Sequence, residues 1–220
     1  MPIIFDFDGV IADSEIPSSL AVAQALTEAG MPTTLDDVLE HYLGRNWQDS
    51  QAAMRRIWGR EPPADLGARC HEILSADGAL PVSPVPGVAE FLGEIGKHSR
   101  AIASSSSPDW ITDHLDQMGL RGHFDDKMIF SAAVHVSRGK PHPDIYLHAA
   151  QVLGARPESV TVIEDSPTGV AAAFAAGTKV IGLCAGGHIR PGHDTALRAA
   201  GAHEVAWSYA EVSRLIGCWR

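Results

Sequence analysis

The stretch Ile3-Ile4-Phe5-Asp6-Phe7-Asp8-Gly9-Val10 decides the fold, because an apolar run ends abruptly in two carboxylates and a glycine. An apolar run of this kind predicts a strand, and ligands bind at the strand ends of open α/β sheets. Asp6 and Asp8 would repel each other there unless a cation or a shared proton relieves the repulsion. The stretch therefore predicts a metal site, a nucleophile with an acid–base partner, or both. The alternative is an Asp-rich turn after a strand.

Beyond residue 87, predicted strands and helices alternate along the chain. Strands are expected at residues 101–104, 127–131, 160–163, 180–183 and 204–206, and helices at residues 108–118, 143–153 and 167–176. Strands separated by helices of this length form a parallel sheet with right-handed crossovers. Ser107 and Ser166 each precede a helix that begins with proline, and both are predicted N-caps.

Residues 14–82 have helical character and contain no good strand candidate. Helices are expected at residues 18–29, 35–42, 47–58 and 64–76, and a stiff Pro-rich connector follows at residues 81–87. This helical segment therefore interrupts the sheet between its first strand and the remaining strands.

The composition excludes several classes of function. Of the 220 residues, 45% are hydrophobic, so a sizeable core can form, and the formal net charge is −10. Nucleic-acid binding needs a basic face, so we expect no nucleic-acid partner, although a phosphorylated substrate remains compatible with a locally positive site. We expect no membrane association, because no apolar run reaches the ~20 residues of a membrane span and no signal peptide is recognised. The unpatterned cysteines indicate free thiols in a reducing compartment, and we expect a cytoplasmic protein.

Two further segments place candidate phosphate ligands after predicted strands. The run Ser104-Ser105-Ser106-Ser107 lies between a strand and a helix, where hydroxyl and backbone N–H groups can hold a phosphate. The alternative is a polar loop with an N-cap. The segment Gly139-Lys140-Pro141 holds a lysine that could neutralise a phosphate and a nucleophile together. The alternative is a solvated loop lysine.

The segment Val160-Thr161-Val162-Ile163-Glu164-Asp165-Ser166 is a second apolar strand that ends in two acids. Hard cations such as Mg²⁺ take carboxylate oxygens, so Asp6 and Asp165 suit a magnesium site. Asp165 could instead cap the next helix, but Ser166 already fills that position.

Other polar and aromatic residues give weaker signals. The eleven histidines form no metal-binding pattern. His188 and His193 flank a Gly-rich loop that could face the site, but we expect exposed loop histidines. The function of Gly186-Gly187-His188 is left open. Trp47, Trp58 and Trp110 lie at helical spacing, which favours packing.

Taken in order, the motifs Asp-Phe-Asp-Gly-Val, Ser-Ser-Ser, Gly-Lys-Pro and Glu-Asp-Ser resemble those of the haloacid dehalogenase superfamily. More narrowly, they are similar to its phosphatase and β-phosphoglucomutase-like branch with a small helical cap. The resemblance covers essentially the whole chain. It implies an α/β fold with a three-layer, Rossmann-like parallel sheet core of residues 1–13 and 83–220 and an inserted α-helical cap of residues 14–82.

The resemblance also implies a role for each motif residue. Asp6 would be the nucleophile that forms an aspartyl phosphate, and Asp8 would be the general acid and base. Lys140 would hold the phosphoryl group. The implied phosphate-binding residues also include Ser104, Ser105 and Gly9, and the implied Mg²⁺ ligands are Asp6, Asp8 through its backbone carbonyl, Asp165 and Glu164. This chemistry is consistent, because a carboxylate nucleophile divides ester hydrolysis into two displacements and one acid can serve both.

We therefore expect an Mg²⁺-dependent phosphomonoesterase that acts on a small phosphorylated metabolite such as a sugar or polyol phosphate. A β-phosphoglucomutase-like isomerase is the alternative, but its hinge histidine and cap lysine have no counterpart here. The hinge reads Asp13-Ser14-Glu15-Ile16-Pro17-Ser18, and residues 14–82 contain no lysine. A third possibility is an inactive phospho-ligand binder. We expect a monomer, with a dimer as the alternative.

Arg45 is the candidate substrate contact from the helical insert. It follows Gly44 at a break between two predicted helices, in a part of the cap where the resembled family places a substrate-specificity loop. Its guanidinium would add positive charge to a phosphate pocket. The alternative is an ordinary exposed arginine.

Overall fold

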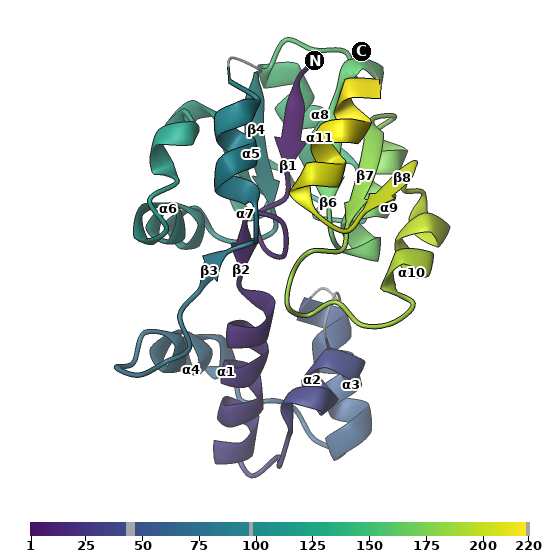
Figure 1. Ribbon diagram of the computed structural model, residues 1–220. Coiled ribbons are helices and arrows are strands. Elements are labelled where there is room, and N and C mark those ends of the chain that lie inside the picture. The colour runs from purple at the N-terminus through teal and green to yellow at the C-terminus, as the bar shows by residue number, and fades with distance from the viewer. Residues whose placement is uncertain (43–46, 97–98, 219–220) are drawn as a thin grey trace. The chain divides into compact units, whose positions relative to one another are not determined.

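The computed structural model describes residues 1–42, 47–96 and 99–218, and it divides into two compact units. The first unit comprises Met1–Asp13 with Ser83–Arg220, and the second comprises Ser14–Val82. Figure 1 shows the elements of both units. None of the helices within the described residues is long and apolar enough to cross a membrane.

A parallel sheet forms the centre of the first unit. As far as the described residues show, its strands are β1 (Ile3–Phe5), β4 (Arg100–Ser104), β5 (Ile129–Ser131), β6 (Thr161–Glu164), β7 (Lys179–Leu183) and β8 (Glu204–Ala206). Their order in space is β5-β4-β1-β6-β7-β8, and all neighbours are parallel. The chain thus extends to one side of β1 first and to the other side later. Ligands bind beyond the carboxyl ends of strands at such a switch in strand order.

Helices cover both faces of this sheet, which confirms the expected three-layer α/β fold. Figure 1 shows α5 (Val88–Glu94) and α11 (Tyr209–Cys218) over one face and α8 (Asp144–Val152) and α9 (Pro167–Ala175) over the other. The remaining helices of the unit are α6 (Pro108–Gln117), α7 (Ala132–His135) and α10 (His193–Ala200), and a short antiparallel pair joins β2 (Ala12–Asp13) to β3 (Ser83–Pro84).

Alternating side chains of β1 supply apolar contacts to the layers on both faces. Ile4 belongs to a buried cluster that includes Ile145 and Tyr146 of α8. Phe5 points to the opposite face, where its ring packs edge-on against Phe91 of α5 with centroids 6.1 Å apart. A strand with both faces covered in this way reads as a continuous apolar run in the sequence.

The second unit is helical throughout its described residues. Its helices are α1 (Glu15–Glu28), α2 (Leu35–His41), α3 (Trp47–Trp58) and α4 (Leu66–Leu74). Their buried cluster includes Leu26, Val38, Met54 and Leu66. Thr34 and Asp37 form a capping box, which explains why α2 begins directly after Thr34.

Two helices begin where the sequence predicted, whereas one short strand begins later than expected. Ser107 accepts a hydrogen bond from Trp110 N, and Ser166 accepts one from Gly169 N, so both predicted N-caps are confirmed. The strand expected at residues 127–131 begins later, because residues 126–128 form a 3₁₀ turn before β5. Asp125 caps this turn by accepting a hydrogen bond from Lys127 N.

Candidate active site

The predicted site residues follow strands that end at the same edge of the sheet. Asp6 follows β1, Ser104 ends β4, and Asp165 follows β6. Phe5, the last residue of β1, is in register with Ile102 of β4 and with Ile163 of β6, so the three strands end near one another at this edge. This arrangement brings polar side chains from distant parts of the sequence together beside β1.

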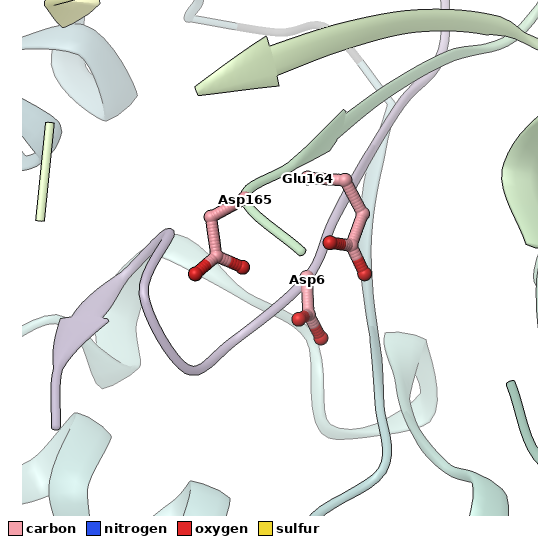
Figure 2. Close-up of side chains that lie close together, drawn as sticks. All are labelled: Asp6, Glu164 and Asp165. Atoms are coloured by element: carbon pink, nitrogen blue, oxygen red, sulfur yellow. The ribbon is translucent and has the colours of Figure 1, made fainter. Parts of the chain in front are cut away.

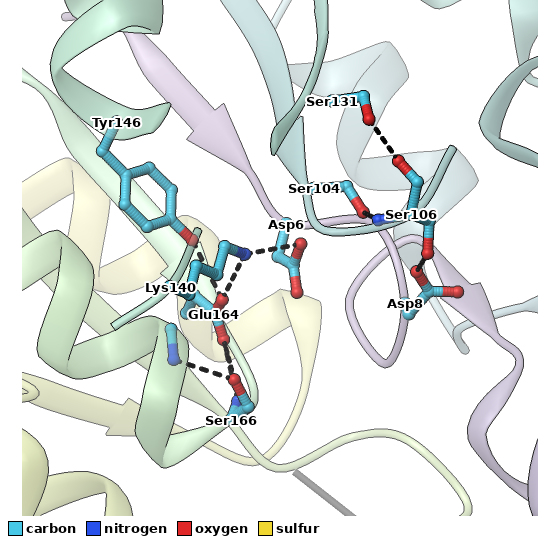
Figure 3. Close-up of polar contacts among 10 residues, drawn as sticks. Asp6, Asp8, Ser104, Ser106, Ser131, Lys140, Tyr146, Glu164 and Ser166 are labelled. Carbon is cyan, nitrogen blue, oxygen red and sulfur yellow. Dashed lines mark hydrogen bonds and ion pairs between the residues drawn. The ribbon is translucent and has the colours of Figure 1, made fainter. Parts of the chain in front are cut away.

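Lys140 joins two of the predicted acids (Figure 3). Its Nζ lies 2.8 Å from Asp6 Oδ1 and 2.7 Å from Glu164 Oε1. The ammonium group also lies over the Tyr146 ring, 5.0 Å from the centroid. Burial disfavours the charged form of Lys140, but the charges of Asp6 and Glu164 outweigh burial and hold its pKa well above the usual range. The structure therefore shows a buried, charged lysine rather than a solvated one.

Glu164 is fully buried, and both of its oxygens accept hydrogen bonds. Oε1 accepts from Lys140 and from the Tyr146 hydroxyl at 2.9 Å, and Oε2 accepts from Ser166 N at 2.8 Å and Ser166 Oγ at 3.0 Å. Burial opposes ionisation, but Lys140 outweighs it, so the pKa of Glu164 lies below the usual value. Gly169 is required beside it, because a Cβ there would lie 1.6 Å from Oε1. Glu164 is thus fixed as an anchor for Lys140.

Three carboxylates face a common space in this part of the site (Figure 2). Asp6, Glu164 and Asp165 each offer an oxygen, and these oxygens lie within 4.8 Å of one another. Burial raises the pKa of Asp6 well above its usual range, and the neighbouring carboxylates add to the shift despite Lys140. Burial and Glu164 raise the pKa of Asp165 in the same way. Burial and mutual repulsion therefore both oppose full ionisation of this cluster.

A hard divalent cation fits this donor set. Mg²⁺ prefers carboxylate oxygens, and its charge would offset the repulsion between Asp6 and Asp165. Gly9 makes room for the second of these ligands. It has a φ of 72°, and a Cβ at this position would lie 1.9 Å from Asp165 Oδ2. Glycine is therefore needed after Asp8, because a side chain at this position would collide with the Asp165 carboxylate.

Asp165 has two histidine partners that the sequence did not reveal. His188 Nε2 lies 3.0 Å from Asp165 Oδ2, and His193 Nε2 lies 2.6 Å from the Asp165 carbonyl oxygen. The expectation of exposed loop histidines is wrong for His188, whose side chain is 2% exposed. The same Gly-rich loop is held to the start of the chain, because Gly187 N donates to Asp13 Oδ1 at 3.0 Å. The loop after β7 thus packs onto the segment that carries Asp6.

Asp8 lies in different surroundings from Asp6, although only one residue separates them. Ser106 Oγ donates to Asp8 Oδ2 at 2.6 Å, and Trp110 Nε1 donates to Asp8 Oδ1 at 3.0 Å. Figure 3 shows the serine loop beside Asp8 and the lysine cluster beside Asp6. The Trp110 contact was missed, because helical spacing favoured simple packing for this residue. The structure makes it a polar partner of the predicted acid–base group.

The serine loop is shaped by its own hydrogen bonds. Ser104 is buried, and its Oγ accepts from Ser106 N at 3.0 Å, whereas Ser105 is exposed. Ser131 Oγ donates to the Ser106 carbonyl oxygen at 2.7 Å and ties the loop to β5. The phosphate-binding roles of Ser104, Ser105 and Gly9 remain predictions. The metal-ligand roles of the Asp8 carbonyl and of Glu164 remain predictions as well. Arg45 lies outside the described residues.

Comparison with known proteins identifies relatives along most of the chain. Residues 3–183 match the model of a family described as haloacid dehalogenase-like hydrolase. The fructose-1-phosphate phosphatase YqaB of Escherichia coli (strain K12) is 29% identical over 179 residues, which cover 81% of this chain and 94% of the relative. A phosphorylated carbohydrates phosphatase of Thermotoga maritima is 32% identical over 183 residues, with coverages of 81% and 82%.

A longer relative and a solved structure complete the comparison. Protein SUPPRESSOR OF QUENCHING 1, chloroplastic, of Arabidopsis thaliana is 32% identical over 188 residues. The match covers 82% of this chain but 17% of the relative, so the chain spans only a small part of that protein. The crystal structure of a conserved haloacid dehalogenase-like protein from Agrobacterium tumefaciens matches with a TM-score of 0.86 at 33% identity, covering 99% of this chain and 98% of that chain.

Proposed function

This chain belongs to the haloacid dehalogenase-like hydrolase family and is a phosphatase of that family, and we propose that it hydrolyses a small phosphorylated metabolite through a phosphorylated Asp6. A sugar or polyol phosphate is the proposed substrate class. Relatives named as fructose-1-phosphate phosphatase and phosphorylated carbohydrates phosphatase support this class. We also propose that the protein is cytoplasmic and acts as a monomer.

The proposed mechanism rests on the different surroundings of the Asp6 and Asp8 carboxylates. Asp6 is 8% exposed and pairs with Lys140 within the acid cluster. Asp8 is partly exposed and accepts hydrogen bonds from Ser106 and Trp110 instead. Carboxylates in different environments can take different roles in one reaction. We assign nucleophilic attack to Asp6 and proton transfer to Asp8.

In the first displacement, an Asp6 oxygen attacks the phosphorus atom of the ester. The new bond between this oxygen and phosphorus forms as the bond from phosphorus to the leaving oxygen breaks. Asp8, in its protonated form, gives its proton to the leaving oxygen, so an alcohol departs rather than an alkoxide. The product of this step is a phosphoryl group on Asp6.

In the second displacement, water attacks the same phosphorus atom. Asp8 is now a carboxylate and takes a proton from the water molecule, while the bond between phosphorus and Asp6 breaks. Inorganic phosphate leaves, and both aspartates return to their starting forms. One carboxyl group thus acts as acid and then as base.

Positive charge is needed beside the nucleophile in both displacements. Lys140 supplies it from the protein, and its anchor Glu164 holds the ammonium group in place. Asp6 and Asp165 would hold Mg²⁺ beside it. When bound, Mg²⁺ would neutralise the carboxylates and the phosphoryl oxygens, which favours the ionised form of Asp6.

A phosphate-release screen over sugar, polyol and other metabolite phosphates, run with Mg²⁺, tests the proposal. We expect turnover of a sugar or polyol phosphate, and Asp6→Asn should reduce it by at least ~10³-fold, as expected for loss of a nucleophile. Asp116→Asn is the matched control, because Asp116 is exposed on α6. Wild-type turnover by pure Asp6→Asn protein would refute the covalent mechanism. Failure of the wild type to turn over any ester would refute the proposed substrate class.

A further inference from the structure

Both oxygens of the Asp8 carboxylate accept a hydrogen bond, and the two donors differ in kind. Ser106 Oγ lies 2.6 Å from Oδ2, and Trp110 Nε1 lies 3.0 Å from Oδ1. A hydroxyl can donate or accept, whereas an indole N–H can only donate. The Ser106 hydroxyl can therefore accept a hydrogen bond from Oδ2 when Asp8 is neutral and donate one to Oδ2 when Asp8 is ionised. Trp110 makes the same hydrogen bond in both states.

Trp110 is itself fixed by local contacts. Its backbone N donates to the helix N-cap Ser107 at 3.3 Å, and its carbonyl oxygen lies 2.8 Å from His114 Nδ1. The Trp110 and His114 rings lie against each other with centroids 3.9 Å apart. The backbone contacts fix Trp110 in the first turn of α6, and the His114 ring restricts the indole. A restricted donor can hold the Asp8 carboxyl group in one orientation.

Ser106 is fixed from two directions as well. Its backbone N donates to Ser104 Oγ at 3.0 Å, and its carbonyl oxygen accepts from Ser131 Oγ at 2.7 Å. The loop after β4 is thus tied to two neighbouring strands. Together with α6, it presents both donors to Asp8 from a single strand-to-helix connection.

We infer that Trp110 is a positioning residue that holds the Asp8 carboxyl group ready for proton transfer by donating its indole N–H to Oδ1. The inference rests on the proposed function, because it requires Asp8 to be the acid and base of the phosphatase reaction. Each oxygen has two lone pairs, so a substrate oxygen or water can meet Asp8 while the Trp110 hydrogen bond remains. Precise placement of a catalytic group contributes to rate, and small displacements are costly.

Trp110→Phe tests the inference, because it keeps an aromatic ring beside His114 and removes the N–H. We would measure kcat and KM for the best alkyl phosphate found in the screen and for 2,4-dinitrophenyl phosphate. An alkoxide needs a proton to leave, whereas dinitrophenolate does not. We expect kcat/KM for the alkyl ester to fall by about 10- to 100-fold, within the ~10²–10⁴ range of acid–base catalysis. For the aryl ester, kcat/KM should stay within about twofold.

The ratio of the two kcat/KM values does not depend on the fraction of folded enzyme, so a partly unfolded variant still gives an answer. Trp207→Phe is the matched control, since the Trp207 side chain is 54% exposed and lies outside the site, and its ratio should not change. An unchanged ratio in Trp110→Phe would overturn the inference. An increased rate with the alkyl ester would also overturn it, because Trp110 would then hold Asp8 in an unproductive position.

Asp8→Asn separates this inference from the proposed function. The proposed function predicts that Asp8→Asn lowers kcat/KM for the alkyl ester and leaves kcat/KM for the aryl ester nearly unchanged. If Asp8→Asn shows the selective loss and Trp110→Phe does not, only the positioning role of Trp110 is wrong. If Asp8→Asn shows no selective loss, Asp8 is not the acid and the proposed mechanism fails.

Discussion

Glu164 connects the candidate nucleophile to the protein core through Lys140. Glu164→Gln keeps the size of the side chain and removes its charge. We expect the free energy of unfolding at neutral pH to fall by about 2 kcal/mol, the magnitude typical of hydrogen bonds to charged groups. Denaturant unfolding of both proteins in chelator measures this difference. Glu40→Gln, an exposed substitution on α2, is the matched control.

The pH dependence of this difference follows from the lowered pKa of Glu164. A carboxyl whose pKa is lower in the folded state stabilises the fold above its unfolded pKa, which is ~4.3 for glutamate. This stabilisation is lost as the pH falls through the folded-state pKa. The difference between wild type and Glu164→Gln should therefore be full at neutral pH and disappear in acid. A difference that grows in acid would contradict the ion pair with Lys140.

Individual residues differ in how far the sequence revealed their surroundings. The predicted parallel sheet explains why three of the site residues lie close together. Asp6 and Asp165 follow predicted strands, and Lys140 lies in a segment between a predicted strand and a predicted helix. His188 and Trp110 also follow predicted strands, but nothing in the sequence identified the carboxylates that they contact. Their contacts with Asp165 and Asp8 arise where a Gly-rich loop and a helix pack against the end of β1. Local patterns do not encode contacts of that kind.

Helix α6 begins at a cap that the sequence predicted. Ser107→Ala removes the acceptor for Trp110 N, and we expect a loss of about 1 kcal/mol in the free energy of unfolding. Ser107→Asp restores a side-chain acceptor and places a negative charge at the helix N-terminus, so it should recover most of that loss. Chemical denaturation of the three proteins measures the effect. An unchanged free energy of unfolding in Ser107→Ala would show that the cap does not stabilise α6.

Elements with clear sequence boundaries were easier to predict than short ones. The helices at α6 and α9 begin with a serine cap followed by proline, and the structure confirms both starts. Helix α7 has only four residues and was missed, because such a segment is too short to show helical periodicity. The antiparallel pair β2–β3 was also missed, since each strand has two residues and the pairing joins distant parts of the chain.

Mg²⁺ should stabilise the folded protein, because the proposed ligands Asp6 and Asp165 meet only in the fold. At a Mg²⁺ concentration of ~100 Kd, the expected gain is about 2.7 kcal/mol. For a protein of this length, that gain raises Tm by about 5–10 °C. Asp165→Asn should remove most of this shift, and Asp116→Asn should keep it. A full shift in Asp165→Asn, or full turnover in EDTA, would contradict the metal site.

The complete reaction should release inorganic phosphate in proportion to the substrate consumed. The sequence lacks the hinge histidine and the cap lysine of the β-phosphoglucomutase-like alternative, so we expect the phosphoryl group to pass to water. Parallel assays of phosphate and of the remaining ester measure this balance. Conversion of β-glucose 1-phosphate to glucose 6-phosphate without phosphate release would instead identify a mutase.

Trapping the phosphoryl group on Asp6 tests the central claim most directly. Asp8→Asn should accept a phosphoryl group from 2,4-dinitrophenyl phosphate, because this leaving group needs no acid, and should lose it slowly for lack of a base. After rapid mixing with Mg²⁺ and an acid quench, mass spectrometry of the peptides locates the group. The account predicts a burst of dinitrophenolate equal to the enzyme concentration and one added phosphoryl group on Asp6. Steady turnover without a burst, or a phosphoryl group on any other residue, would contradict it.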